Sequence, residues 1–261
     1  MDIDARQEQI ADLVRAQKHV RALALSKMYD VSLETIRKDL QTLQERGVLI
    51  RVHGGAQIQA ISQESAYERR RFVNQAAKQA IGAAAAVDLE DDATIYLDYG
   101  TTTYALAARL VQDGRRLTVL TNAMPIVQLL AGATNIETIV LGGILRRNER
   151  SLYGPIAERA LDNLYMDIGF FGCAGVHAQA GITNPHAFEA AASHKAMLHC
   201  NAVVVLADAA KLDAVAANKV ADLDRVDTLI TTAKPGPELS EALNMANTTV
   251  VVTQEDIDGI S

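Results

Sequence analysis

Apolar residues recur at helical spacing near the start of the chain. Ile10, Leu13 and Val14 share one face of the helix that this spacing predicts over residues 3–17. The next apolar segment predicts a second helix over residues 20–29. The expected core residues of this second helix are Leu23, Leu25 and Met28.

The third helical segment has the clearest pattern in the chain. Ile36, Leu40 and Leu43 recur at i, i+4 and i+7 and form one apolar stripe. Ser32 precedes the stripe and is a favourable N-cap. Gly47 follows it and predicts the C-terminal end of the helix.

A strand and a glycine turn follow this helix directly. Residues 48–52 have the pattern of a strand, and Gly54-Gly55 predicts a turn into a second strand. Asp30-Val31 forms a short connection between the second and third helices. Three helices, a tight connection and a hairpin in this order predict an α+β winged helix-turn-helix domain over residues 1–57.

Polar residues of the third helix and the hairpin are candidates for DNA contact. Arg, Lys, Gln and Thr side chains that lie away from the apolar stripe can meet phosphates and base edges in a major groove. A small helical bundle with a solvated charged face is the alternative interpretation. The expected DNA-binding residues are Ser32, Thr35, Arg37, Lys38, Gln41, Arg51, His53 and Gly54.

After residue 57 the pattern changes twice. Residues 58–74 form a predicted linker that is partly helical, and its basic run Arg69-Arg70-Arg71 could touch DNA or be solvated. Residues 75–261 then form a second domain that starts with an Ala-rich helix over residues 75–87. Beyond it, short apolar strands alternate with longer helices, which predicts an α/β fold with a mostly parallel sheet. The expected strands are 94–97, 117–121, 136–141, 168–173, 202–207, 228–231 and 248–252, and the expected helices include 103–111, 125–130, 156–163 and 189–198.

Polar and glycine residues cluster where these strands end. The carboxyl ends of parallel strands form the ligand-binding edge of such sheets. The run Asp98 to Thr103 after the first strand is the best anion-binding candidate, because Gly100 permits a tight turn and a helix start offers free N–H groups. It is neither a Walker A loop nor a dinucleotide fingerprint. The other clusters at strand ends are Thr121-Asn122, Gly142-Gly143, Gly172 with Gly175, and Asp208 with Lys211.

Composition narrows the class of protein. The chain has 261 residues and a net charge of −7, and residues 1–57 carry nine basic and eight acidic side chains. The acidic excess therefore lies in the second domain, which argues against nonspecific coating of nucleic acid. No long apolar segment predicts a membrane span, no secretory signal is visible, and Cys173 and Cys200 lack metal-ligand spacing. We expect a cytoplasmic protein with reduced thiols, no cofactor and no metal.

The chain resembles the DeoR family of bacterial transcriptional regulators over nearly its whole length. The matching residues of the first domain are Val31-Ser32, Thr35 to Leu40, Gly47 and Arg51 to Ala56. Those of the second are Asp98, Gly100 to Thr103, Thr121-Asn122, Leu141 to Gly143, Gly154, Asp167, Phe171-Gly172, Gly175, Gly181, Lys195, Ala207-Asp208 and Lys211. Two departures are Lys38 where the family often has Arg, and Ala209-Ala210 where it often has Ser.

The resemblance implies a sensor domain related in fold to ribose-5-phosphate isomerase and CoA transferases. It also implies an effector that is a phosphorylated sugar or a related metabolite, which usually induces a repressor. The expected effector-binding residues are Asp98, Gly100, Thr101, Thr102, Thr103, Thr121, Asn122, Gly142, Gly143, Gly175, Lys195, Asp208 and Lys211.

Three functions are weighed on this basis. The first is a regulator, a repressor of a carbohydrate-utilisation operon, that binds double-stranded operator DNA as a homo-oligomer and leaves it when the effector binds. The second is a sugar-phosphate isomerase fused to a DNA-binding domain, with Asp167, Glu189 and Lys195 as candidate catalytic groups. The third is a scaffold that uses the α/β domain for assembly.

Overall fold

The computed structural model describes residues 3–17, 19–45, 49–52, 54–58 and 66–253. The chain divides into two compact units, an N-terminal unit (Met1–Glu64) and a C-terminal unit (Ser65–Ser261). Within the described ranges, no helix has the length and apolar character that crossing a membrane requires.

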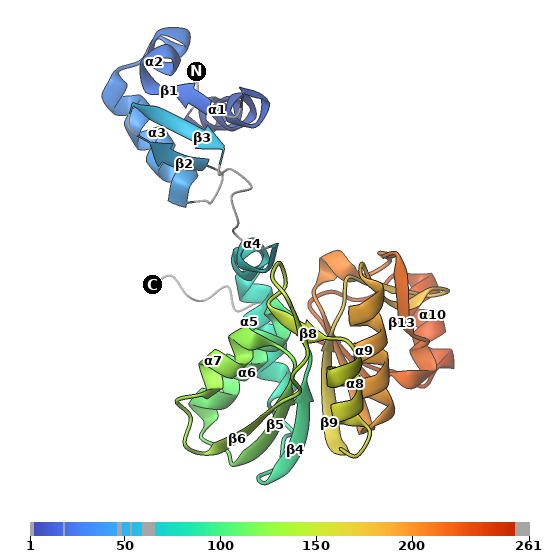
Figure 1. Ribbon diagram of the computed structural model, residues 1–261. Coiled ribbons are helices and arrows are strands. Elements are labelled where there is room, and N and C mark those ends of the chain that lie inside the picture. Colours follow the sequence, from blue (N-terminus) through green and yellow to red (C-terminus); the bar gives the residue numbers. More distant parts are fainter. Residues whose placement is uncertain (1–2, 18, 46–48, 53, 59–65, 254–261) are drawn as a thin grey trace. The chain divides into compact units, whose positions relative to one another are not determined.

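The N-terminal unit has three helices and a small antiparallel sheet (Figure 1). Its elements are α1 (Ile3–Gln17), β1 (His19–Arg21), α2 (Ala22–Tyr29), α3 (Leu33–Glu45), β2 (Leu49–Val52) and β3 (Gly55–Ile58). The strand order is β1-β3-β2, and β2 and β3 form the expected hairpin, here called the wing (residues 49–58). The predicted stripe of α3 is buried against α1, since Ile36, Leu40 and Leu43 are at most 3% exposed. The expected winged helix-turn-helix is therefore confirmed.

The second helix is shorter than the sequence predicts. Residues 19–21 form a strand that pairs with β3, and the helix starts only at Ala22. This start rotates the buried face onto Ala22 and Leu25. The predicted core positions Leu23 and Met28 are wrong, because their side chains are 54% and 59% exposed. Pairing with a strand far along the chain is invisible to local helical spacing.

The C-terminal unit is built on a seven-stranded sheet in which every pair of neighbouring strands is parallel. Its strands are β4 (Ala93–Leu97), β5 (Leu117–Thr121), β6 (Ile136–Val140), β9 (Met166–Gly172), β12 (Cys200–Ala207), β14 (Thr228–Thr231) and β15 (Thr249–Val252). The order is β15-β14-β12-β9-β4-β5-β6, so the parallel α/β fold that the sequence predicts is confirmed.

Helices cover both faces of this sheet (Figure 1). The helices of one face are α5 (Gln75–Ala85), α6 (Thr101–Asp113) and α7 (Met124–Leu130); those of the other are α8 (Pro155–Leu161), α9 (Ala187–Leu198) and α10 (Pro237–Met245). Two apolar clusters match the two faces: one includes Ile81 and Leu106, and the other includes Met197 and Leu243. Burial on both sides explains why the central strands are continuous apolar runs.

Short antiparallel strands lie at the carboxyl edge of the sheet. They were not predicted from the sequence. They are β7 (Ile144–Arg146), β8 (Ser151–Tyr153), β10 (Gly175–His177), β11 (Gly181–Asn184) and β13 (Asn218–Ala221). β7 and β8 form the β7–β8 hairpin (residues 144–153). Runs of three or four residues have too little periodicity to be recognised in a sequence.

Part of the predicted linker is a helix of the C-terminal unit. This helix, α4 (Ala66–Phe72), carries Tyr67, whose side chain is 1% exposed. The backbone N–H of Tyr67 donates to the carbonyl oxygen of Asn148 in the β7–β8 hairpin at 3.1 Å. The chain therefore enters the C-terminal unit through a docked helix.

The revised register of α2 gives a test with a matched pair of leucines. Leu25→Ala leaves a cavity in the small core and is expected to lower the free energy of unfolding by about 2–4 kcal/mol. Leu23→Ala removes an exposed side chain and should change it by less than about 0.5 kcal/mol. Hydrogen exchange of the α2 and α3 amides in the full chain measures both. Equal effects of the two substitutions would contradict the register.

Candidate functional site

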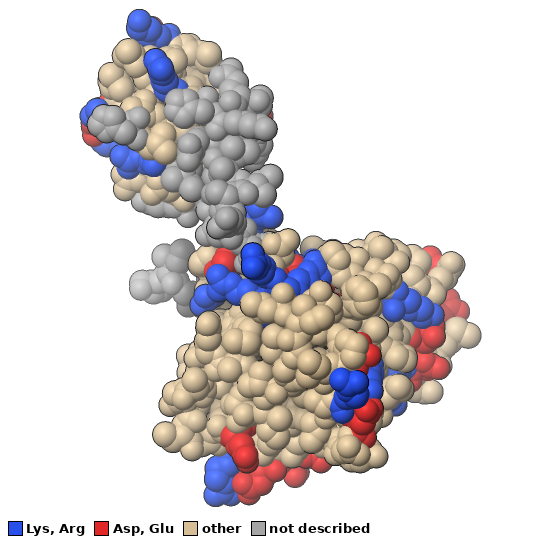
Figure 2. Space-filling model, viewed as in Figure 1, with Lys and Arg blue, Asp and Glu red and all other residues tan. Residues whose placement is uncertain are grey.

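The DNA-facing candidates on α3 lie mostly on its exposed side. Ser32 is the N-cap, because its hydroxyl accepts a hydrogen bond from the backbone N–H of Thr35 at 3.1 Å. Arg37, Lys38 and Gln41 are exposed, and Arg37 lies 3.8 Å from Glu34 in a solvent-exposed pair. Ser32 and Thr35 thus shape the start of the helix, while the longer side chains are free of the core. In the view of Figure 2, the charged side chains on this unit are mainly basic.

The helix is held to the unit by a buried ion pair on its opposite side. Asp39 accepts hydrogen bonds from Arg6 Nε at 2.7 Å and from Gln7 Nε2 at 3.0 Å. Asp39 and Arg6 are both almost fully buried. These bonds join α1 to α3 and fix the direction in which the exposed face of α3 points. The sequence analysis noted Asp39 only as part of the family pattern.

The wing presents the remaining candidates. Arg51 is exposed on β2, and its backbone N–H donates to Gln44 Oε1 at 2.9 Å. Gly54 has φ +83°, a left-handed conformation that favours glycine, and its carbonyl accepts from the N–H of Ala22. His53 lies outside the described residues.

The C-terminal unit has a cavity at the carboxyl edge of its sheet. From β4, the strands β5 and β6 are added along the sheet toward one edge. The strands β9, β12, β14 and β15 are then added toward the other edge, so the strand order reverses between β4 and β9. Such a switch point is where open α/β sheets bind ligands. The cavity encloses about 200 Å³. Its lining includes Arg70, Asn74, Lys78, Tyr99, Gly100, Thr101, Thr102, Glu149, Gly172, Cys173, Asn184, Glu189, Asp208, Ala210 and Lys211.

The turn that opens α6, residues 98–103, forms one wall of this cavity and is here called the Gly100 turn. Gly100 has φ +138°, which disfavours a side chain at that position. No side chain caps the helix, and among the described residues the backbone N–H groups of Thr101 and Thr102 have no hydrogen-bond acceptor. The first turn of a 13-residue helix therefore offers free donors and a positive dipole end to the cavity.

Five of the predicted effector residues line the cavity: Gly100, Thr101, Thr102, Asp208 and Lys211. Asp208 accepts a hydrogen bond from Asn74 Nδ2 at 3.2 Å and from the backbone N–H of Ala210 at 3.1 Å. Lys211 ends a short 3₁₀ turn after β12. The structure thus brings together residues that follow strands β4 and β12 and are more than 100 positions apart in the chain.

Asp98 and Thr103 lie beneath the cavity and do not line it. Asp98 is fully buried, and its carboxyl accepts hydrogen bonds from Ser193 Oγ at 2.8 Å and Tyr96 Oη at 3.4 Å. Burial raises the pKa of Asp98 to about 8. Thr103 is also fully buried, and its hydroxyl donates to the carbonyl oxygen of Gly100 at 3.1 Å. These two residues fix the Gly100 turn from below.

Thr121 ties the end of β5 to β4, and Asn122 holds the β7–β8 hairpin at the sheet edge. The Thr121 hydroxyl donates to the Leu97 carbonyl at 2.7 Å, and Asn122 Nδ2 donates to the Leu152 carbonyl at 3.3 Å. The three other glycines among the candidates permit close packing. A Cβ at Gly143 would lie 2.6 Å from the Tyr153 carbonyl, one at Gly175 would lie 2.1 Å from the Ala214 carbonyl, and Gly142 has φ +64°.

Lys195 is placed away from the cavity. Its ammonium lies 2.5 Å from Asp162 Oδ1, at the end of α8. Lys195 and the buried Glu189 belong to the same helix, α9. Six positions separate them, and the structure shows that only Glu189 lines the cavity.

The sequence analysis missed much of the cavity wall. Arg70, Asn74 and Lys78 come from the predicted linker and the Ala-rich helix, and Glu149 comes from the β7–β8 hairpin. Arg70 Nη1 donates to Glu149 Oε1 at 3.1 Å. The run of three arginines was the available signal, but a sequence cannot show that only the middle one pairs with a residue 79 positions away.

Buried charges dominate the far wall of the cavity. Both oxygens of Glu189 are engaged, one by Ser151 Oγ at 2.6 Å and the other by the guanidinium of Arg146. Burial raises the pKa of Glu189. Burial also lowers the pKa of Lys78 to about 8, with Asp208 opposing that shift.

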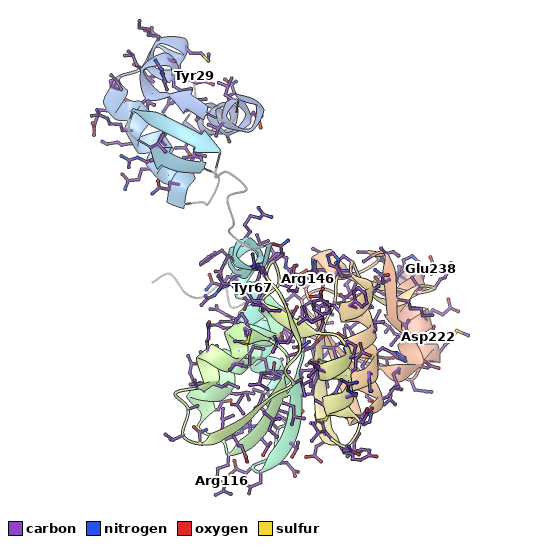
Figure 3. The ribbon with its side chains drawn as sticks, viewed as in Figure 1. Tyr29, Tyr67, Arg116, Arg146, Asp222 and Glu238 are labelled. Atoms are coloured by element: carbon purple, nitrogen blue, oxygen red, sulfur yellow. The ribbon has the colours of Figure 1, made fainter. Side chains whose placement is uncertain are left out.

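Tyr67 and Arg146 lie at the same end of the unit in Figure 3, and Arg116 lies at the other.

The cavity thiol is in its neutral form, and the described residues contain no cluster of metal-binding side chains. Burial raises the pKa of Cys173 to about 12, so this cavity thiol stays protonated at neutral pH. The search for three or more His, Cys, Asp or Glu side chains that could hold a metal finds none in the described part of the chain.

A winged helix-turn-helix and a parallel α/β domain with a cavity at its switch point are the architecture of a DNA-binding protein with a sensor domain. The description "DeoR-like helix-turn-helix domain" matches residues 6–62, and "DeoR C terminal sensor domain" matches residues 73–233. The chain belongs to the DeoR family of transcriptional regulators.

Relatives match along nearly the whole chain. The L-fucose operon activator of Haemophilus influenzae is 30% identical over 86% of this chain and 90% of its own. The HTH-type transcriptional regulator GlpR of Haloferax volcanii is 30% identical over 94% and 96%, and the repressor GlcR of Bacillus subtilis is 29% identical over 95% and 95%. A solved ribose 5-phosphate isomerase A from Methanocaldococcus jannaschii covers 52% of this chain and 53% of its own, with 17% identity and a TM-score of 0.39.

The catalytic groups of the isomerase alternative are not assembled. Asp167 is exposed near the amino end of β9, opposite the cavity edge, and accepts from the backbone N–H of Thr94 at 2.8 Å. Lys195 is paired with Asp162, and Glu189 is engaged by Arg146 and Ser151. A general base must reach its substrate proton, so this trio does not form a catalytic site.

The buried carboxyl of Asp98 gives a pH-dependent prediction. Its pKa is about 8 in the folded chain and near 3.8 when exposed, so the folded chain retains a proton that the unfolded chain loses. The stability that this carboxyl contributes is present at low pH and is lost as the pH rises through 8.

Asn at position 98 mimics the neutral carboxyl and should remove this dependence. The Tm of Asp98→Asn relative to wild type is expected to rise by at least about 3 °C between pH 6 and pH 9, since about 1 kcal/mol corresponds to 2–4 °C at this size. Thermal unfolding followed by circular dichroism measures it. A constant Tm difference across this range would contradict a protonated Asp98. Glu189, whose charge contributes to the raised pKa of Asp98, is present in both proteins.

Proposed function

We propose that this protein is a repressor of a carbohydrate-utilisation operon that leaves its operator when a phosphorylated sugar or related metabolite binds the C-terminal cavity. The observation that carries the effector class is the uncapped start of α6 facing a cavity that also contains Lys78 and Lys211. Free N–H groups at a helix start together with nearby ammonium groups suit a phosphoryl group.

The rest of the cavity suits the polar remainder of such a ligand. Asn184, Asp208 and Glu149 supply amide and carboxylate oxygens around the same space. Sugar hydroxyls can donate to these oxygens. A volume of about 200 Å³ favours a small metabolite over a dinucleotide.

DNA is bound in this proposal by α3 and the wing. The exposed side chains of Arg37, Lys38 and Gln41 enter the major groove, and Arg51 contacts the backbone nearby. A homo-oligomer would place two such units on paired half-sites. The sugar-operon role draws on the relative named as an L-fucose operon activator, and the relatives also include the transcriptional repressor GlcR.

Arg37 tests the DNA-binding side. Arg37→Ala is expected to weaken operator binding by about 1–3 kcal/mol, because a guanidinium that reads a base bidentately contributes that much discrimination. Lys27→Ala, on the exposed surface of α2, is the control and should have a much smaller effect. Fluorescence anisotropy with labelled operator at fixed salt gives both affinities. If Arg37→Ala binds as tightly as wild type, α3 is not placed as proposed.

Thr101 and Thr102 test the effector side. Replacing either with Ala removes a hydroxyl at the α6 start and should raise the sugar-phosphate concentration needed for operator release about tenfold, the effect of losing one charge-assisted hydrogen bond. Operator affinity without ligand should not change. Thr249→Ala, an exposed threonine on β15, is the matched control. Wild-type response in both cavity variants would mean that neither hydroxyl contacts the phosphoryl group, and release that requires no ligand would oppose the repressor role.

A further inference from the structure

The helix α4 is the segment through which the chain enters the C-terminal unit, after the residues that follow the wing. The β7–β8 hairpin holds its outer side. Tyr67 donates to Asn148 through its backbone, Arg150 Nη1 lies 2.8 Å from Glu68 Oε1, and Arg70 pairs with Glu149. Figure 2 shows basic side chains gathered over α4. The position of α4 therefore depends on the buried side chain of Tyr67 and on these polar contacts with the hairpin.

Lys78 holds the carboxyl end of α4, together with Arg71, which donates to Tyr104 Oη on α6 at 3.1 Å. The ammonium of Lys78, on α5, donates to the backbone carbonyl oxygens of Arg70 and Val73. The last carbonyls of a helix lack intrahelical partners, so a cation there satisfies them and meets the negative end of the helix dipole. Lys78 is only 6% exposed.

Lys78 also lines the cavity, on the same space as Thr101 and Thr102. An ammonium has three N–H donors, and among the described residues the third donor of Lys78 has no partner. The Lys78 ammonium therefore already lies beside the space that an anion would enter.

We propose that Lys78 couples the cavity to α4: a phosphoryl group held at the Gly100 turn draws the Lys78 ammonium away from the carbonyl oxygens of Arg70 and Val73 and so loosens α4. This inference rests on the proposed function, and it names the residue through which ligand binding reaches the segment leading to the DNA-binding unit. A ligand shifts such an equilibrium only by binding one state better, and here the loosened state offers it an additional cation.

Electrostatics favours this exchange. Hydrogen bonds from an ammonium to a phosphoryl oxygen are stronger than those to a neutral carbonyl, and the difference grows where water is excluded. The positive charge of Lys78 has little negative charge near it. Burial and the nearby Arg70 and Lys211 charges lower its pKa, and Asp208 opposes that shift. An anion at the Gly100 turn supplies the missing negative charge.

The experiment follows α4 directly in the full chain. Hydrogen exchange of the amides of residues 67–73 is measured in 20 mM inorganic phosphate and in chloride of equal ionic strength, with phosphate binding measured separately by calorimetry. We expect phosphate to accelerate exchange in wild type about tenfold, the effect of losing one hydrogen bond of ordinary strength. In Lys78→Met, exchange should already be fast and should not respond. Lys195→Met, a lysine outside the cavity, should behave as wild type.

The outcomes separate the coupling from the function beneath it. Phosphate that binds wild type without changing α4 exchange overturns the coupling and leaves the effector proposal standing. Phosphate that binds nowhere in the chain overturns both. A response of α4 that persists in Lys78→Met assigns the coupling to another residue and overturns the role of Lys78. If Lys78→Met fails to fold, unchanged α4 exchange in wild type with bound phosphate still overturns the coupling.

Discussion

A buried carboxylate requires partners, and at Glu189 that requirement organises one whole side of the sensing cavity. Ser151 and Arg146, the only partners of this carboxylate among the described residues, both come from the β7–β8 hairpin, which is thereby held over the carboxyl edge of the sheet. Leaving such a charge unpaired typically costs about 3–5 kcal/mol. The hairpin in turn supplies Glu149, the partner of Arg70 on α4. The buried carboxylate of Glu189 thus supports the β7–β8 hairpin, which forms one cavity wall and contacts α4.

The sheet topology determines what those walls enclose. Because strand order reverses between β4 and β9, the connections that follow these strands lead to opposite faces of the sheet, and the cavity that the start of α6 faces lies at this point. Two of the cationic side chains around this space already have partners, since Arg70 is paired with Glu149 and Lys78 with carbonyl oxygens at the end of α4. An anionic ligand therefore enters a set of existing partnerships and changes them, which is how a binding site becomes a sensor.

Periodic segments were predictable from the sequence, and long-range pairings were not. The stripe of Ile36, Leu40 and Leu43 and the main strands follow from spacing alone. The error at Leu23 arose because β1 pairs with a strand more than 30 positions later. The Gly100 turn was recognised because glycine, threonines and a helix start are local signals. Lys78 was missed because its role depends on carbonyls of a helix that the sequence suggested was a linker.

The central claim is that the backbone N–H groups of Thr101 and Thr102 hold the phosphoryl group of a metabolite. A crystal structure of the full chain with a sugar phosphate that changes its operator affinity tests this most directly. We expect phosphoryl oxygens within about 3 Å of both nitrogen atoms, with the Lys78 ammonium turned toward them. A phosphoryl group bound outside the cavity, with these N–H groups still unoccupied by ligand, would contradict the claim.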